Sequence, residues 1–291
     1  MKKYFVCSDI HGFFNEWINS LMESGFDKYN PNHILIVLGD IFDRGSQPLE
    51  VYNYIRSFPT NRVILIRGNH EYLLLDLLKR KYPLRHDYSN GTFETLTYIY
   101  KNPEKEQYKF ILENKGKIEK DLLYALSGQV YNQTYKELFT NEKVKEIARW
   151  IKSKRWKDYF ELDDYIFVHA FIPLKGRKDA YLDERGKYYS DWRNNTSKEG
   201  WEEATWGCPY KLYLNHCFDE ELKNNKVLVC GHWYTSDFYN KMLYKDEPER
   251  QLDARIENPI FKSDLFPGLI GIDACTALTK KVNVLIIESE K

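Results

Sequence analysis

The stretch HILIVLGDIFDRG, residues 33–45, runs from a continuous apolar segment straight into a turn that holds two carboxylates and an arginine. Two other stretches repeat this pattern, YFVCSDIHG at residues 4–12 and VILIRGNHE at residues 63–71. Apolar runs of this length, without alternation, are typical of strands buried on both faces. We therefore predict three buried strands, each ending at a cluster of polar side chains.

Helix-like segments at 14–24 and 48–58 separate these strands, which predicts βαβ units and a parallel sheet. Two later apolar runs also end at histidines: 165–168 leads into His169, and 226–230 leads into Gly231 and His232. The final runs, 269–272 and 282–287, read as two more strands. Ligands bind beyond the carboxyl ends of such strands, so we expect the polar loops to meet in one crevice.

Three segments interrupt this pattern. Residues 72–158 are rich in Leu, Lys, Glu and Tyr and predict a helical, cap-like insertion over or beside the crevice. Residues 171–223 carry several Trp and Gly and predict an irregular insertion, and 245–262 predict a loop or hairpin. No repeat or flexible linker divides the chain, so we expect one domain over residues 1–291. The insertion's tyrosines are expected to pack helices together, with stacking on a nucleobase as the alternative.

Composition narrows the classes of function. The chain of 291 residues has 43 basic and 43 acidic side chains, which argues against general nucleic-acid binding. No apolar run approaches the length that spans a bilayer, and the apolar stretch near the start is too short for a secretory signal. Five scattered cysteines predict neither a disulfide framework nor a cysteine-ligated zinc site. A cytoplasmic protein is the simplest expectation, and oligomeric state is left open.

Taken together in this order, the motifs resemble those of the phosphoprotein phosphatase branch of the calcineurin-like metallophosphoesterases. That group includes bacterial-type serine/threonine phosphatases and symmetrical dinucleoside tetraphosphatases. Its pattern is GDxHG, GDxxDRG and GNHE followed by two separate histidines, matched here at 8–12, 39–45, 68–71, His169 and His232. The one departure is Ser8 in place of Gly. The resemblance implies an α/β, four-layer fold: a β-sandwich of mixed sheets flanked by helices.

The resemblance also implies two divalent metal ions. One would be held by Asp9, His11 and Asp40, and the other by Asp40, Asn69, His169 and His232, with Asp40 bridging. A mixed oxygen and imidazole donor set suits transition metals, so Mn²⁺ is expected first, with Fe, Zn or Ni as alternatives. A hydroxide between the two ions would attack phosphorus in line.

Further roles are implied for residues beside the ligands. His70 would be the general acid that protonates the leaving oxygen, with Asp43 orienting it; the alternative is a histidine that only satisfies a hydrogen bond. Arg44 would bind the phosphoryl group. Arg67 and Arg193 are further candidates for that task. The alternative for Arg67 is a strand-end ion pair with a surface carboxylate.

The expected function is hydrolysis of phosphomonoesters, with phosphoproteins (Ser/Thr, and also Tyr) as the first class of substrate. The alternative is cleavage of a phosphoanhydride in a dinucleoside polyphosphate or a capped RNA end. A catalytically idle module that binds metal and a partner is a third reading, and it is disfavoured because every implied ligand and the implied acid are present. The partners expected are therefore a phosphorylated protein or a nucleotide.

Overall fold

The computed structural model describes residues 1–100, 137–175, 187–188, 192–194 and 197–290. Its first sheet has five strands in the order β12-β1-β2-β3-β4. These strands are β1 (Lys2–Cys7), β2 (His33–Val37), β3 (Val63–Ile66), β4 (Trp156–Lys157) and β12 (Leu285–Ser289). The strands β1, β2, β3 and β4 are parallel, and β12 runs antiparallel to β1. The three strands predicted from the apolar runs are thus neighbours in one sheet.

Helices connect the parallel strands and cover the outer face of the first sheet. They are α1 (Phe14–Glu23), α2 (Pro48–Arg56) and α3 (Asn69–Arg80), and a 3₁₀ turn at Thr60–Arg62 precedes β3. Pro48 begins α2 at the position where a missing N–H costs nothing. Trp17 and Leu21 on α1 and Ile55 on α2 are buried in the same apolar cluster as the outward side chains of the sheet.

The second sheet has the order β10-β11-β9-β6-β5. Its strands are β5 (Phe160–Leu162), β6 (Tyr165–Phe167), β9 (Val227–Tyr234), β10 (Phe261–Lys262) and β11 (Leu269–Asp273). The inner strands β6, β9 and β11 are parallel, whereas both edge strands are antiparallel to their neighbours. A separate two-stranded ladder joins β7 (Leu174–Lys175) to β8 (Lys187–Tyr188).

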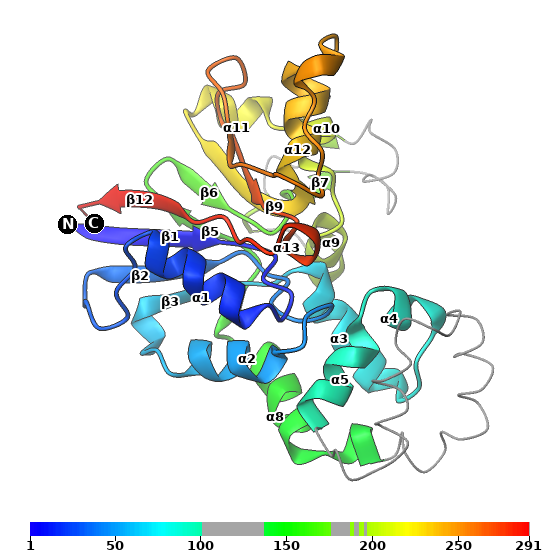
Figure 1. Ribbon diagram of the computed structural model, residues 1–291. Helices are drawn as coiled ribbons and strands as arrows, with labels where there is room; N and C mark the ends of the chain where they lie inside the picture. The colour runs from blue at the N-terminus through cyan, green and yellow to red at the C-terminus, as the bar shows by residue number, and fades with distance from the viewer. Residues whose placement is uncertain (101–136, 176–186, 189–191, 195–196, 291) are drawn as a thin grey trace.

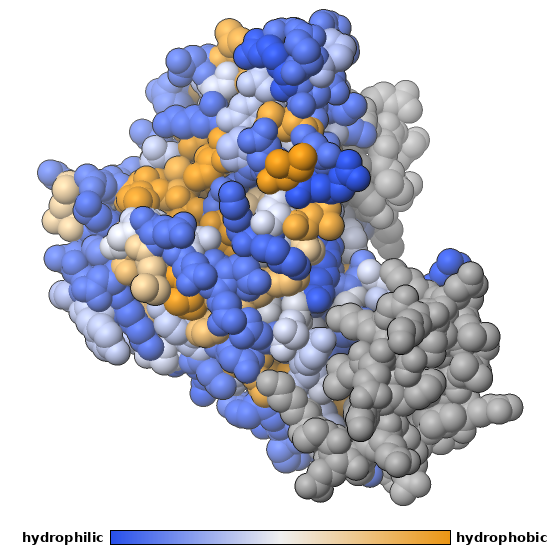
Figure 2. Space-filling view, viewed as in Figure 1, coloured by the Kyte–Doolittle hydropathy of each residue, from blue (hydrophilic) through white to orange (hydrophobic). Residues whose placement is uncertain are grey.

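The two sheets pack face to face, with an apolar layer between them that includes Val6 and Ile36 from the first sheet and Phe167 and Val229 from the second. Each outer face carries its own apolar cluster and helices. The result is the expected four-layer α/β sandwich of two mixed sheets (Figure 1). In Figure 2 hydrophobic residues gather along the line where the sheets meet, while much of the rest of this face is hydrophilic.

The predicted helical insertion is helical where the structure describes it. After α3 come α4 (Arg85–Ser89), α5 (Thr92–Tyr100) and α8 (Glu142–Ile151), which lie at one end of the molecule (Figure 1). Residues 101–136, with most of the insertion's tyrosines, lie outside the described residues. One part of the expectation was wrong: Trp156–Lys157 form β4, because Trp156 pairs with Leu65 and buries its ring against the sheet.

The segment 171–223 is more regular than expected where it is described. It contains α9 (Lys198–Ala204), α10 (Pro209–Leu214) and α11 (Asp219–Lys223). Three large rings of this segment are buried against the second sheet, those of Trp192, Trp201 and Tyr210. This burial stabilises short helices whose apolar residues show little helical periodicity. The polar stretch 245–262 holds only a 3₁₀ turn, Pro248–Arg250, and the edge strand β10.

The remaining elements follow the last strands. A short helix α12 (Thr235–Phe238) and a π-helical turn, Tyr239–Leu243, continue from β9, and α13 (Thr276–Thr279) follows β11. Within the part of the chain that the structure describes, no helix is both long and apolar enough to cross a membrane.

Candidate metal centre

Both sheets deliver polar residues to the same end of the sandwich. Asp9 and His11 follow the end of β1, and Asp40 follows the end of β2. The next strand is followed by Asn69 at the start of α3, and the second sheet contributes His169 after β6 and His232 within β9. Five of these six side chains, all except His169, line one cleft of about 500 Å³. His169 is buried next to these residues, with its Nε2 2.9 Å from Asn69 Oδ1.

The donor atoms of these residues form two groups that share Asp40. In the first, His11 Nε2 lies 3.9 Å from Asp9 Oδ1 and 3.9 Å from Asp40 Oδ2. In the second, His169 Nε2 lies 3.5 Å from Asp40 Oδ2 and 3.2 Å from His232 Nδ1. Donor atoms of Asp40, His169 and His232 all lie within 4.8 Å of one another. Spacings of this size suit a cation between the donors.

Backbone carbonyls orient two of the imidazoles. His11 Nδ1 lies 2.9 Å from the Phe42 carbonyl oxygen and His169 Nδ1 lies 2.6 Å from that of Leu38. Each Nδ1–H donates to a carbonyl, so each Nε2 turns its lone pair toward the carboxylates. Burial, followed by Arg44, lowers the pKa of His11 well below its usual value. A neutral imidazole is the form that binds metal, and the residues therefore fit divalent ions.

Buried carboxylates face the same space. Asp9 and Asp40 are each 2% exposed. Burial raises the pKa of Asp40 well above its ordinary value; His70 opposes this and Asp9 adds to it. Carboxyl groups packed this closely ionise together only if positive charge is near, which a bound cation supplies.

The loops reach these positions through strained backbone. Asp9, His11, Asp40 and His232 all have positive φ, between 50° and 66°, a region that side chains other than glycine rarely adopt. Strain of this kind persists only where surrounding contacts enforce it. One such contact is the bond from the His11 N–H to the Asp40 carbonyl, 2.8 Å.

The Glu71 side chain also holds the backbone of these loops in place. Its buried carboxylate accepts the backbone N–H groups of Asp40 at 2.9 Å, Ile41 at 3.0 Å and Gly68 at 2.7 Å. Glu71 lies in the first turn of α3. In the structure Glu71 also ties the β2 loop to the β3 loop, so it supports the ligand residues without facing the cleft.

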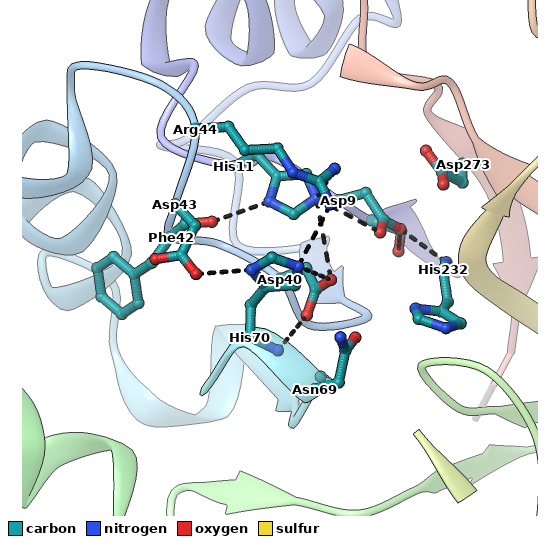
Figure 3. Close-up of polar contacts among 12 residues, drawn as sticks. Asp9, His11, Asp40, Phe42, Asp43, Arg44, Asn69, His70, His232 and Asp273 are labelled. Atoms are coloured by element: carbon teal, nitrogen blue, oxygen red, sulfur yellow. Dashed lines mark hydrogen bonds and ion pairs between the residues drawn. The ribbon is translucent and has the colours of Figure 1, made fainter. Parts of the chain in front are cut away.

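His70 and Asp43 form a buried pair beside the ligands. His70 Nδ1 donates to Asp43 Oδ2 at 2.6 Å, and His70 Nε2 lies 3.8 Å from Asp40 Oδ2 (Figure 3). Burial lowers the pKa of His70, but Asp40 and the hydrogen bond to Asp43 outweigh it, so the pKa is raised. By distance alone His70 also groups with His11 and Asp40 as a possible ligand. Its bond to Asp43 suits a proton donor instead.

Of the three candidate arginines, the structure brings only Arg44 to the cleft. Arg44 Nη1 donates to His11 Nε2 at 2.9 Å and Nη2 lies 3.4 Å from His70 Nε2. Arg67 pairs with Asp158 at 2.6 Å, which is the alternative that the sequence left open.

Arg193 lies on the outer side of the second sheet. Its guanidinium bonds to Glu221 at 2.8 and 2.9 Å and to Glu161, and it stacks on the Trp192 ring. Neither Arg67 nor Arg193 lines the cleft. Both guanidinium groups are occupied by carboxylates, so the geometry does not favour phosphate binding by either.

Sequence reasoning missed much of the cleft wall. The additional lining residues are Asn90, Trp206, Cys208, Lys211, Trp233, Tyr234 and Asp273. Two of these residues could have been identified from their positions in the sequence. Asp273 is the first polar residue at the carboxyl end of the predicted strand 269–272, and Trp233 directly follows His232. Tyr234 ends β9, and the other four come from insertions whose packing no local pattern reveals.

The sequence model of the family described as calcineurin-like phosphoesterase matches residues 2–236. A curated relative, the symmetrical bis(5'-nucleosyl)-tetraphosphatase of Buchnera aphidicola subsp. Baizongia pistaciae, is 38% identical over 77 residues. That match covers 26% of this chain and 26% of the relative, about a quarter of its length.

Among solved structures, the cold-active protein-tyrosine phosphatase of a psychrophilic Shewanella species aligns over 99% of this chain and 76% of that chain. Its TM-score is 0.50 at 15% identity, a likeness that shows a shared fold. A protein serine/threonine phosphatase from Saccharomyces cerevisiae covers 100% of this chain and 81% of that chain, with a TM-score of 0.45 and 14% identity.

Proposed function

The chain belongs to the calcineurin-like phosphoesterase family, and on that premise we propose that it is a metal-dependent phosphatase acting on phosphomonoesters. The observation that carries this proposal is the presence of two donor groups that share Asp40, one with Asp9 and His11 and one with His169 and His232. The His70–Asp43 pair lies beside them. Phosphorylated proteins are the first class of substrate that we propose.

The proposed ligands follow the two groups of donor atoms. One ion would be held by Asp9, His11 and Asp40, and the other by Asp40, Asn69, His169 and His232. When bound, two divalent ions supply a Lewis acid for the phosphoryl oxygens and lower the pKa of an attacking water. The nitrogen and oxygen donors suit transition metals, and we propose Mn²⁺ as the first to test.

The remaining residues would bind the phosphoryl group and supply a proton. Arg44 extends its guanidinium into the cleft, where its planar fork can hold two phosphoryl oxygens. His70, held by Asp43 at Nδ1, presents Nε2 toward the same space and would donate its proton to the leaving oxygen.

Phosphate release by the purified protein tests this proposal. The assay would compare p-nitrophenyl phosphate, a phosphoserine peptide and a phosphotyrosine peptide, each with added Mn²⁺ and with a chelator. An Asp40→Asn variant, which loses the shared carboxylate, controls for a contaminating phosphatase. We expect turnover that needs metal and is lost in the variant. Two bound ions without turnover of any ester would contradict the proposal and favour a metal-binding module.

A nucleoside polyphosphate is the second candidate substrate, and one wall of the cleft favours it. Trp206, 36% exposed, and Trp233 pack their rings edge-on against His232, with centroids 6.1 and 6.2 Å away. Tyr234 and Lys211 extend this wall. Aromatic faces beside a phosphate site suit stacking of a base. The partly matching relative is itself a dinucleoside tetraphosphatase.

A Trp206→Leu variant distinguishes the two candidate substrates. The side chain is partly exposed and is not a proposed ligand, so its replacement should leave the ligands in place. If nucleotides are the substrate, KM for diadenosine tetraphosphate should rise about tenfold, the value of one base stack of ~1–3 kcal/mol. KM for the phosphoserine peptide should change less than about twofold. Equal changes for both would argue against a base-binding wall.

A further inference from the structure

Asp43 is bonded by two threonines as well as by the histidine it was expected to orient. Its carboxylate is fully buried. Oδ2 accepts from His70 Nδ1–H at 2.6 Å and from the Thr92 hydroxyl at 2.7 Å. Oδ1 accepts from the Thr95 hydroxyl at 2.9 Å, and Thr95 Oγ1 accepts the Asp43 N–H at 2.9 Å. Each carboxylate oxygen therefore has a threonine donor, and Oδ2 is shared between Thr92 and His70.

Both threonines belong to α5, which lies in the helical insertion and not in the motif-bearing core. Thr92 is the first residue of the helix, and Thr92 and Thr95 are both completely buried. The positive end of the helix thus faces the Asp43 carboxylate, an orientation that stabilises negative charge.

The backbone before α5 also packs on the turn that carries Asp43. Gly91 has φ +83°, and a Cβ at this position would lie 2.5 Å from the Arg44 backbone nitrogen. Asp43 and Arg44 themselves have φ of 74° and 66°. A turn with two consecutive residues in the left-handed region needs outside contacts to hold it. The segment 91–95 supplies those contacts.

We infer that α5 of the insertion positions the proposed acid, with Thr92 and Thr95 as positioning residues that act through Asp43 on His70. This inference rests on the proposed phosphatase function. The insertion would then contribute to proton transfer without touching substrate through these threonines. Replacing a hydroxyl by a methyl at either position removes a donor to a buried carboxylate and frees that carboxylate to rotate away from His70.

The loss should depend on the leaving group. A hydrogen bond to a charged group is worth ~1.5–3 kcal/mol, which corresponds to a factor of roughly 10 to 100. An alkyl phosphate such as glycerol phosphate needs protonation of its leaving oxygen, whereas p-nitrophenolate leaves without it. We expect Thr92→Val/Thr95→Val to lower kcat for glycerol phosphate about tenfold or more, and kcat for p-nitrophenyl phosphate less than about threefold.

Two further variants control the experiment. Thr97→Val changes the same helix, at a buried side chain whose hydroxyl bonds only to the Glu94 carbonyl among the contacts described, so both rates should stay unchanged. Thr95→Ser keeps the hydroxyl and should retain most of the glycerol phosphate rate even if the double variant folds poorly.

The outcomes separate this inference from the function on which it rests. Wild-type protein that releases phosphate from neither ester, with metal bound, would contradict the proposed function itself. If the wild type is active and the double variant matches Thr97→Val on both esters, the positioning role is overturned. Equal losses on both esters would overturn it as well, because they would indicate a purely structural role for the threonines.

Discussion

His70 lies between two carboxylates, with Asp43 Oδ2 2.6 Å from Nδ1 and Asp40 Oδ2 3.8 Å from Nε2. Its ring is 3% exposed, which by itself favours the neutral form. The two carboxylates outweigh burial and raise the pKa of His70, whereas burial dominates at His11 and His232 and lowers theirs. Neighbouring side chains thus shift the pKa of His70 in the opposite direction to the pKa values of His11 and His232 within a single cluster.

A His70→Asn variant tests this division of roles. Asparagine keeps a hydrogen-bonding side chain but cannot donate a proton to an alkoxide, so kcat for alkyl phosphates should fall about 10²–10⁴-fold, the usual value of general acid catalysis. Metal content, measured by elemental analysis against wild type, should stay unchanged. Loss of one ion together with activity would instead make His70 a ligand, as its distance to Asp40 allows.

At the scale of elements, the end of β9 meets the end of β1. The His232 N–H donates to Asp9 Oδ2 at 3.0 Å, so a strand of the second sheet orients a carboxylate of the first (Figure 3). Gly231 permits this approach, because a Cβ there would lie 1.8 Å from Ser8 Oγ and 2.3 Å from Asp9 Oδ2. Ser8 itself bonds to Asp9 Oδ2. The sheets are therefore in close contact at the proposed ligands as well as in the core.

Gly231→Ala should both destabilise the fold and disturb the site. Overpacking at a buried contact typically costs ~1–3 kcal/mol, and the displaced groups are Ser8 and the proposed ligand Asp9. We expect a lower urea midpoint and reduced metal content. Gly25→Ala is the control for a glycine substitution away from the site: Gly25 has a positive φ, +82°, and no atom lies within 4 Å of its added Cβ.

The Gly25→Ala variant should therefore lose some stability through backbone strain and retain its metal. If Gly231→Ala binds metal as well as wild type does, the close contact between β9 and Asp9 does not matter for the site.

At the scale of the whole molecule, the sandwich buries all five cysteines, between 0% and 5% exposed. None forms a disulfide. Burial raises the pKa of Cys7 to about 12 and those of Cys208 and Cys275 to about 11. Since the thiolate is the reactive form, folding both hides these sulfurs and keeps them protonated.

Alkylation at pH 8 should therefore be slow in the native protein. A thiol with a pKa of about 11 is ionised to about one part in a thousand at this pH, so a raised pKa lowers reactivity even before access is considered. We expect the five thiols to be labelled at least ~100-fold faster in urea than in the native protein, with labelling measured by mass spectrometry. Rapid native labelling of Cys208, which lines the cleft, would show that the cleft wall opens.

The sequence by itself determined the parallel strands β1–β3 and the loops at their carboxyl ends. Continuous apolar runs and adjacent polar residues are local signals, and parallel topology brings such ends together. The expected four-layer sandwich is confirmed, and the residues proposed as ligands do meet. Their roles stay predictions.

Only the tertiary structure decided which distant side chains join this cluster. Thr92 and Thr95 reach Asp43 because α5 packs beside the turn, and Arg193 faces Glu221 instead of the cleft. Asp273 enters the cleft from the second sheet. The bonds from Asp43 to Thr92 and Thr95 span 49 and 52 residues, and the bond from Arg193 to Glu221 spans 28. Such pairings depend on how distant segments pack together, and a local pattern of apolar and polar residues does not predict that packing.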